Sequence, residues 1–125
     1  LDHPEAGEHL FWLDGISDAD LNNTYGISSC LIAASNGEGF GLPLIEAAQK
    51  GLPIIARDLP VFREVAHEGA YFFKGDTPQD LQAAIHRWLE LYRQGSHPKS
   101  DAIKCVSWSE SALSLISQMN LQSAL

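Results

Sequence analysis

Residues 35–48 read SNGEGFGLPLIEAA and follow an apolar run that ends at Ala34. Three glycines fall within five positions of this stretch. Glycine permits backbone angles that are closed to other residues and lets a ligand approach the main chain closely. Pro43 then begins a helical segment, because proline in the first turn gives up an N–H that has no partner there. The stretch therefore predicts a strand, a tight loop and a helix N-terminus.

Two carboxylates stand on either side of the predicted helix start. The free N–H groups and the positive end of the helix dipole at such a start suit an anionic or hydroxyl-rich ligand. Glu38 falls in the loop, and Glu46 lies about one turn inside the helix, where side chains lean back toward the N-terminus. Both carboxylates are therefore expected to face the same opening. The alternative is structural: glycines that shape a turn, and two solvated glutamates.

Strands and helices alternate along the remaining sequence. The predicted strands are residues 9–13, 29–34, 53–56 and 70–73, and the predicted helices are residues 17–25, 42–50, 61–67, 78–94 and 108–121. This alternation predicts an α/β fold with a mainly parallel, Rossmann-like sheet flanked by helices. Ligands bind such sheets at the carboxyl ends of the strands, which is where the loop after Ala34 falls.

Apolar patterns predict which faces of these elements are buried. The continuous run 29–34 is typical of a strand covered on both faces. Trp88 and Tyr92 keep helical spacing with the apolar residues around them, which indicates a core position. The last helix has its own apolar face, and we expect its members to be core residues: Ala112, Leu113, Leu115, Ile116 and Met119.

Length and charge exclude several classes of protein. The 125 residues are enough for one domain with a single core, and 16 acidic against 8 basic residues give a net charge of −8. Because phosphate contacts need clustered Lys and Arg, nucleic acid is not expected as the main partner. Apolar runs are shorter than the roughly 18–20 residues of a membrane helix. Cys30 and Cys105 have no paired spacing, which indicates reduced thiols in a cytoplasmic protein.

Glu38 and Glu46 enclose seven residues that include Gly-Phe-Gly-Leu-Pro. This motif resembles the donor-sugar motif of the family 4 (group 1) retaining glycosyltransferases of the GT-B fold. Further segments resemble the same family: residues 11–15, 20–25, 51–56, 59–65 and 108–109. The likeness is greatest to bacterial enzymes that build lipopolysaccharide or other surface glycans, several of which are mannosyltransferases. It implies that residues 1–125 are the donor-binding domain in the C-terminal half of a GT-B fold.

The resemblance implies a role for each residue of the motif. Glu38 matches the residue that hydrogen-bonds the hydroxyls of the donor sugar and counts as the catalytic residue. Glu46 matches the residue that binds the ribose hydroxyls. The backbone amides that meet the sugar and the distal phosphate match Gly39, Phe40, Gly41 and Leu42.

The chemistry of these groups is compatible with those roles. A carboxylate accepts two hydrogen bonds from a vicinal diol, and charge-assisted bonds are the stronger kind. A helix N-terminus stabilises a departing diphosphate without a metal, so no metal and no cofactor are expected besides a GDP- or UDP-linked donor. Such enzymes are thought to use a front-face mechanism, in which Glu38 acts by positioning and electrostatics. A glycosidase-type carboxylate pair is the competing interpretation.

The other charged residues have structural interpretations. Arg57 follows a strand end, where a surface ion pair is favoured over a phosphate contact. Arg63 and Glu64 fall in the first turn of a predicted helix, where a structural role is favoured over donor contacts. The histidines show no metal-ligand spacing, so no metal site is expected: His3, His9, His67, His86 and His97.

The resemblance also sets limits on what this chain does. The family's diphosphate-gripping basic pair and its acceptor-binding N-terminal domain match nothing in this sequence. We therefore expect a fragment that is inactive by itself, with the helix at 108–121 packing back toward the N-terminal domain. The parent would transfer a hexose, with mannose suggested, to a glycan or lipid-linked acceptor, at the inner face of the membrane if it associates peripherally. A GT-B nucleotide-sugar epimerase and a non-catalytic sugar-nucleotide sensor or scaffold are the alternatives.

Overall fold

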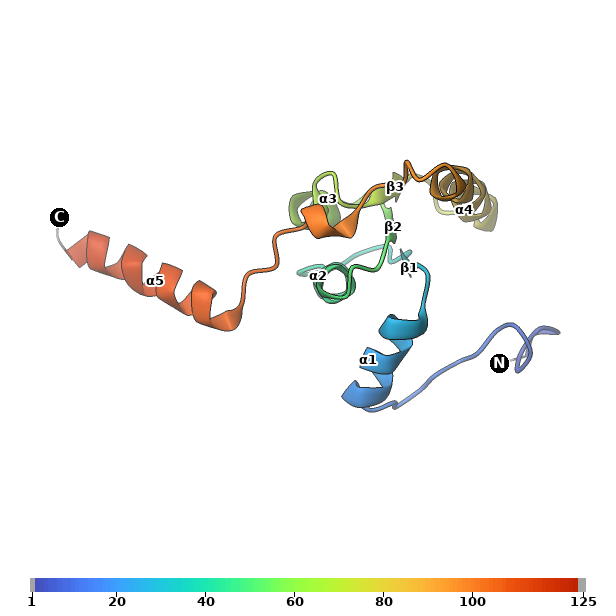
Figure 1. The fold of residues 1–125 in the computed structure, drawn as a ribbon, viewed down its shortest axis with the longest axis horizontal. Helices are drawn as coiled ribbons and strands as arrows, with labels where there is room; N and C mark the ends of the chain where they lie inside the picture. Colours follow the sequence, from blue (N-terminus) through green and yellow to red (C-terminus); the bar gives the residue numbers. More distant parts are fainter. Residues whose placement is uncertain (1, 124–125) are drawn as a thin grey trace.

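Three parallel strands form the centre of the computed structural model, which describes residues 2–123 (Figure 1). The strands are β1 (Leu31–Ala33), β2 (Ile54–Arg57) and β3 (Tyr71–Phe73), and they lie side by side in the order β1-β2-β3. The helices are α1 (Asp18–Ile27), α2 (Leu42–Gln49), α3 (Pro60–Ala66), α4 (Pro78–Arg93) and α5 (Trp108–Ser123), with a short 3-10 helix at Ser100–Ala102. The predicted parallel α/β architecture is confirmed.

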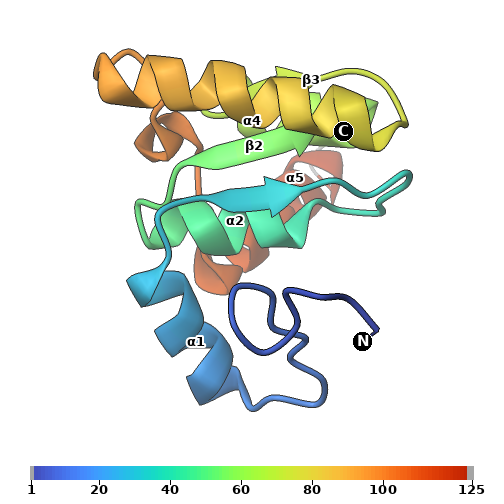
Figure 2. The ribbon, with the colours of Figure 1, turned by 90° about the vertical axis from the view of Figure 1, so that its right-hand side faces the viewer.

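The middle strand β2 separates two layers of core. Successive side chains of a strand point to opposite faces of the sheet. Ile54 and Ala56 accordingly pack with Leu44 of α2 and Phe62 of α3, whereas Ile55 packs with Trp88 of α4. Figure 2 shows α4 on one side of the sheet and α2 on the other. The sheet is therefore covered on both faces at β2.

Local capping signals begin two of the helices as the sequence predicts. The Ser17 hydroxyl accepts a hydrogen bond from the Asp20 N–H at 3.1 Å and begins α1. Thr77 forms a complete capping box at the start of α4, where its hydroxyl accepts from the Asp80 N–H and its own N–H donates to the Asp80 carboxylate. The Thr77 hydroxyl and the Thr77 N–H both donate to the Asp80 carboxylate, and these two bonds hold the pKa of Asp80 below its usual range. Each cap satisfies N–H groups that a helix leaves without partners.

The prediction of a strand at residues 9–13 is wrong. This segment is irregular, and its aromatic side chains are exposed, Phe11 to 65% and Trp12 to 75%. An apolar run of strand length indicates a surface to be covered, but a strand also needs a neighbour for its backbone hydrogen bonds. Within residues 2–123, no named strand pairs with this segment.

The burial predicted for β1 is also only partly correct. Ala33 is buried, but Ile32 is 43% exposed. β1 pairs with β2 on one side and stands at the edge of the described sheet. An edge strand has fewer neighbours to cover it, so a continuous apolar run did not guarantee burial on both faces.

The last helix forms as predicted, but its apolar face is not core in this chain. α5 leaves the sheet and extends away from it (Figure 1). Leu113 is 66% exposed and Ile116 53%, and the other members of the predicted core face are exposed as well. Tyr92 of α4 is likewise 44% exposed and stacks on the buried Trp88 with ring centroids 4.9 Å apart. The core prediction therefore holds for Trp88 and is wrong for Tyr92 and the α5 residues.

Candidate functional site

The glycine-rich stretch forms a loop between β1 and α2, at the carboxyl ends of the parallel strands (Figure 2). We call residues 34–41 the motif loop. Glu38 and Gly39 are exposed in it, and Phe40 is 79% exposed. No hydrogen bond or ion pair of Glu38 is seen in the described part of the chain. Its carboxylate is therefore open to solvent and available to a ligand.

Gly41 joins the motif loop to α2. It has a left-handed backbone with φ of +67°, and it precedes Leu42 and Pro43 of the first helical turn. Gly41 is also buried, since a Cβ built on it would lie 3.4 Å from the side chains of Phe62 and Val65. The backbone angle favours glycine here, whereas a Cβ at 3.4 Å would make ordinary van der Waals contact. The junction therefore has one well-defined conformation.

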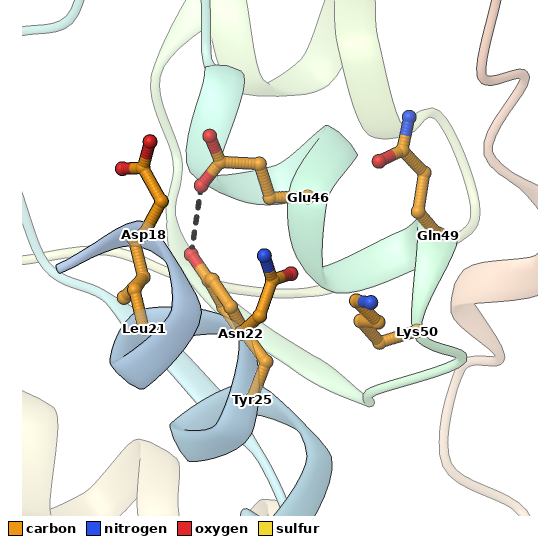
Figure 3. A pocket seen from close by; sticks show the side chains of 7 residues that line it. All are labelled: Asp18, Leu21, Asn22, Tyr25, Glu46, Gln49 and Lys50. Carbon is orange, nitrogen blue, oxygen red and sulfur yellow. Dashed lines mark hydrogen bonds between the residues drawn. The ribbon is translucent and has the colours of Figure 1, made fainter.

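Glu46 is oriented by a residue of another helix. The Tyr25 hydroxyl of α1 donates to Oε2 of Glu46 at 3.1 Å (Figure 3). Burial, the hydrogen bond to Glu46 and the charge of Glu46 together raise the pKa of Tyr25 to about 12. Tyr25 is therefore a neutral hydrogen-bond donor at pH 7. The sequence placed Tyr25 only in a helix, and nothing in its local pattern indicated this contact with a residue 21 positions away.

A polar cavity of about 340 Å³ lies between α1 and α2 (Figure 3). Its wall consists of Asp18, Leu21, Asn22, Tyr25, Glu46, Gln49 and Lys50. Glu46 also lines a second hollow of about 560 Å³, together with Leu42 and Trp108. Neither hollow is lined by Glu38. The structure thus brings Leu42 and Glu46 together and leaves Glu38 on the exposed motif loop.

Arg57 makes contacts that the sequence predicted only in part. Its predicted ion pair is present, with 3.0 Å between Nη1 and Oδ1 of Asp76. The guanidinium also donates to the backbone carbonyls of Ala34, Ser35 and Gly75. The sequence signal for these contacts was the position of Arg57 directly after the predicted strand at 53–56. The carbonyl partners come from two other strand–helix loops, which local sequence does not reveal.

Arg63 has a structural environment, but it lies in the last turn of α3 and not in the first turn, where the sequence placed it. Its guanidinium forms two hydrogen bonds with Asp58, of 2.6 and 3.1 Å, and lies 4.0 Å from the ring centroid of Phe72. The bond to Arg63 holds the pKa of Asp58 below its usual range, and Lys74 adds a second positive charge 3.7 Å away. Two-pronged pairs of this kind fix both side chains.

No group of three or more His, Cys, Asp or Glu side chains within residues 2–123 is arranged to hold a metal ion. No helix in the same range is long and apolar enough to cross a membrane.

The family model described as "Glycosyl transferases group 1" matches residues 2–104, which contain the sheet, the motif loop and the helices α1 and α2 that enclose the polar cavity. This chain belongs to that family. The match covers most of the chain, and it confirms the resemblance carried by Glu38, Glu46 and the residues between them.

Curated relatives of the chain are named as mannosyltransferases. The chain is 51% identical over 117 residues to the serotype-specific mannosyltransferase WbdA of Escherichia coli, a match that covers 94% of this chain and 14% of WbdA. It is 36% identical over 87 residues to the O-antigen chain mannosyltransferase RfbU of Salmonella typhimurium, covering 70% of this chain and 25% of RfbU. An MMP alpha-(1->4)-mannosyltransferase of Mycolicibacterium hassiacum is 32% identical over 101 residues, covering 75% and 25%. The chain thus spans at most a quarter of the length of these relatives, and their names give the epimerase alternative no support.

Proposed function

We propose that this chain is the donor-binding part of a hexosyltransferase for bacterial surface polysaccharide. The parent protein transfers a hexose, with mannose as the first candidate, from a nucleoside-diphosphate sugar to a glycan or lipid-linked acceptor with retention. The observation that carries the proposal is the position of Glu46, which lines both the polar cavity between α1 and α2 and the second hollow, which Leu42 at the start of α2 also lines. Membership of the group 1 family and the names of the relatives support the donor class.

Each residue of the motif has a proposed role. Glu46 binds the ribose hydroxyls, with the Tyr25 hydroxyl on Oε2 setting the orientation of its carboxylate. Glu38 binds the sugar hydroxyls from the exposed loop and stabilises developing charge at the sugar. The backbone amides of residues 39–42 meet the sugar and the distal phosphate at the positive end of α2. The reaction proposed here uses no metal and no cofactor other than the GDP- or UDP-linked donor.

The exposed apolar face of α5 is proposed to be a contact surface within the whole protein. Trp108 is 91% exposed, and Leu113 and Ile116 are more than half exposed on the same helix. We propose that this face packs back toward the acceptor-binding N-terminal domain, which would place the two substrates on either side of one cleft. The whole protein is proposed to act in the cytoplasm, at the inner face of the membrane when the acceptor is a lipid.

The donor class is tested with the full-length protein and a panel of nucleotide sugars. GDP-mannose, GDP-glucose, UDP-glucose and UDP-galactose are supplied with an extract of lipid-linked glycans, and the anomer of the product is followed by NMR. We expect transfer from GDP-mannose with retained configuration. An inverted product would contradict the mechanism, and sugar interconversion without an acceptor would instead indicate an epimerase. Tight binding without any turnover would indicate a sensor, and robust transfer by residues 1–125 alone would overturn the half-site interpretation.

The site assignment is tested with substitutions that keep the shape of each side chain. We expect Glu38→Gln to lower kcat about 100-fold, because a positioned charge at the reacting sugar is lost. We expect Glu46→Gln to raise the KM for the donor about 10-fold, since charge-assisted hydrogen bonds to the ribose are weakened. Glu90→Gln is the matched control, because Glu90 is an exposed partner of Arg87 on α4. Full activity of the Glu38 variant would contradict its assignment.

A further inference from the structure

One side chain connects the carboxyl ends of all three strands. Arg57 is the last residue of β2, and its side chain is 14% exposed. It contacts the residues that follow β1 (Ala34 and Ser35) and those that follow β3 (Gly75 and Asp76). The proposed site residues of the motif loop begin directly after these contacts. Arg57 therefore lies where it can set the position of that loop.

The contacts to the motif loop use one edge of the guanidinium plane, the edge that Nε and Nη2 share. Nε donates to the Ser35 carbonyl at 3.0 Å and to the Ala34 carbonyl at 3.3 Å, and Nη2 donates to the Ala34 carbonyl at 3.1 Å. The ring of Phe73 lies 5.1 Å from the guanidinium carbon, within the range of a cation–π contact. A rigid, planar fork of donors fixes several acceptors at once, which the single ammonium of lysine does not.

The rest of the motif loop has no comparable support. Within the described chain, residues 36–40 make no backbone or side-chain hydrogen bond. The far end of the loop is held by packing, where Gly41 meets Phe62 and Val65. The loop is thus a short span fixed at two points, of which Arg57 supplies the one at the strand end.

The opposite anchor of Arg57 is itself rigid. Gly75 accepts from Nη1 and has φ of +102°, a conformation that side-chain-bearing residues rarely adopt. A Cβ at Gly75 would overlap Asp80, whose carboxylate completes the capping box of α4. Arg57 therefore ties the motif loop to the fixed N-terminus of α4.

We propose that Arg57 is a positioning residue for the donor site. Resting on the proposed function, we infer that it acts through the Ala34 and Ser35 carbonyls, which set where Glu38 and the amides of residues 39–42 stand. Its hydrogen bonds are already made within the protein, so it acts without touching the donor. A displacement of about 1 Å in such a loop costs up to about 100-fold in rate.

The first test measures the loop itself and needs no substrate. Cleavage after Glu38 by a glutamate-specific endoproteinase is compared in the full-length protein and in Arg57→Gln, with Arg87→Gln as control because Arg87 forms an exposed ion pair on α4. We expect cleavage after Glu38 to be at least 10-fold faster in the Arg57 variant, with cleavage after Glu90 of α4 unchanged, because a loop released at one end fits a protease more readily. Unchanged cleavage after Glu38, or equal acceleration after Glu38 and Glu90, would overturn the inference. Arg57→Lys serves as the folded replacement if the Gln variant does not fold, and the same two outcomes decide.

The second test separates positioning from simple loss of fold. Donor kinetics are measured on the same variants at a temperature where all remain folded. We expect kcat/KM to fall about 10- to 100-fold in Arg57→Gln and less in Arg57→Lys, with Arg87→Gln unchanged. A change of less than twofold in Arg57→Gln would overturn the inference. If the wild type transfers no sugar at all, the proposed function fails, and the cleavage experiment alone still decides whether Arg57 holds the motif loop.

Discussion

The middle of the chain and its two ends contain similar apolar residues, but these residues are buried in the middle and exposed at the ends. Among the described residues, every buried core side chain lies between Ala33 and Ile103. The largest aromatic residues of the ends, Trp12 and Trp108, are 75% and 91% exposed. The difference shows that an apolar pattern reveals a face that needs cover without revealing what covers it. In the middle of the chain the apolar side chains are covered by the parallel sheet and its helices. At the two ends no element in the described part of this chain covers them.

The largest expected effect contrasts a core residue with an α5 residue of the same apolar kind. Phe62 is fully buried, so we expect Phe62→Ala to lower the free energy of unfolding of residues 1–125 by about 3–5 kcal/mol. Leu113 is 66% exposed, and Leu113→Ala is expected to change it by no more than about 0.5 kcal/mol. Urea unfolding measures both values.

The same pair of variants sharpens the comparison in the full-length protein. If α5 packs against another domain there, Leu113→Ala becomes strongly destabilising while the cost of Phe62→Ala is unchanged. A cost above about 1 kcal/mol for Leu113→Ala within residues 1–125 would break the comparison, because it would place α5 in the core of this chain.

Two helix caps of similar geometry give the next largest effect. Thr77 and Ser17 both accept a backbone hydrogen bond three residues on, at 3.2 and 3.1 Å. Thr77→Ala is expected to cost about 1 kcal/mol, because α4 packs on the sheet and unfolds with it. Ser17→Ala is expected to cost less in global unfolding, since α1 has no buried residue and frays locally. Equal shifts of the urea midpoint would show that α1 belongs to the same cooperative unit.

The smallest expected effect at neutral pH is the one contributed by Cys30, which appears only in alkaline solution. Burial raises the pKa of the Cys30 thiol from about 9 to about 11, outweighing a backbone hydrogen bond that lowers it. The unfolded chain therefore loses this proton first, so the stability contributed by the thiol is complete below pH 9 and is lost as pH rises to 11.

Alkylation of Cys30 tests the raised pKa of its thiol. In a Cys105→Ser background, iodoacetamide at pH 8.5 is expected to modify Cys30 much more slowly in the folded chain than in urea, since the thiolate is the nucleophile. Equal rates in the two states would contradict a raised pKa. Recovery of the folded-state rate near pH 11 would support it.

The sequence predicted those parts of the fold that are specified locally. Thr77 with Asp80, Ser17 with Asp20, and Gly51 after α2 all mark helix ends through contacts within a few residues. The strand predicted at residues 9–13 and the core face predicted for α5 failed because both depend on partners distant in sequence or absent from the described chain.

The candidate site also has features that the local sequence predicted and features that it did not. The motif loop and its place at the carboxyl edge followed from the glycines and from the alternation of strands and helices. The hydrogen bond from Tyr25 to Glu46 joins residues 21 positions apart, and the reach of Arg57 to Ala34 spans 23. Such pairs are set by the packing of whole elements, which no local pattern contains.

The exposed edge of β1 has a practical consequence. Within the described chain β1 pairs only with β2, so the N–H and C=O groups along its other side have no strand partner. An open, apolar edge of this kind is a template on which a strand from another molecule adds. Ile32 lies on this strand, and Ile27 nearby is 87% exposed. Residues 1–125 produced alone are therefore expected to self-associate as concentration rises, and a solubilising fusion partner would suit work with them.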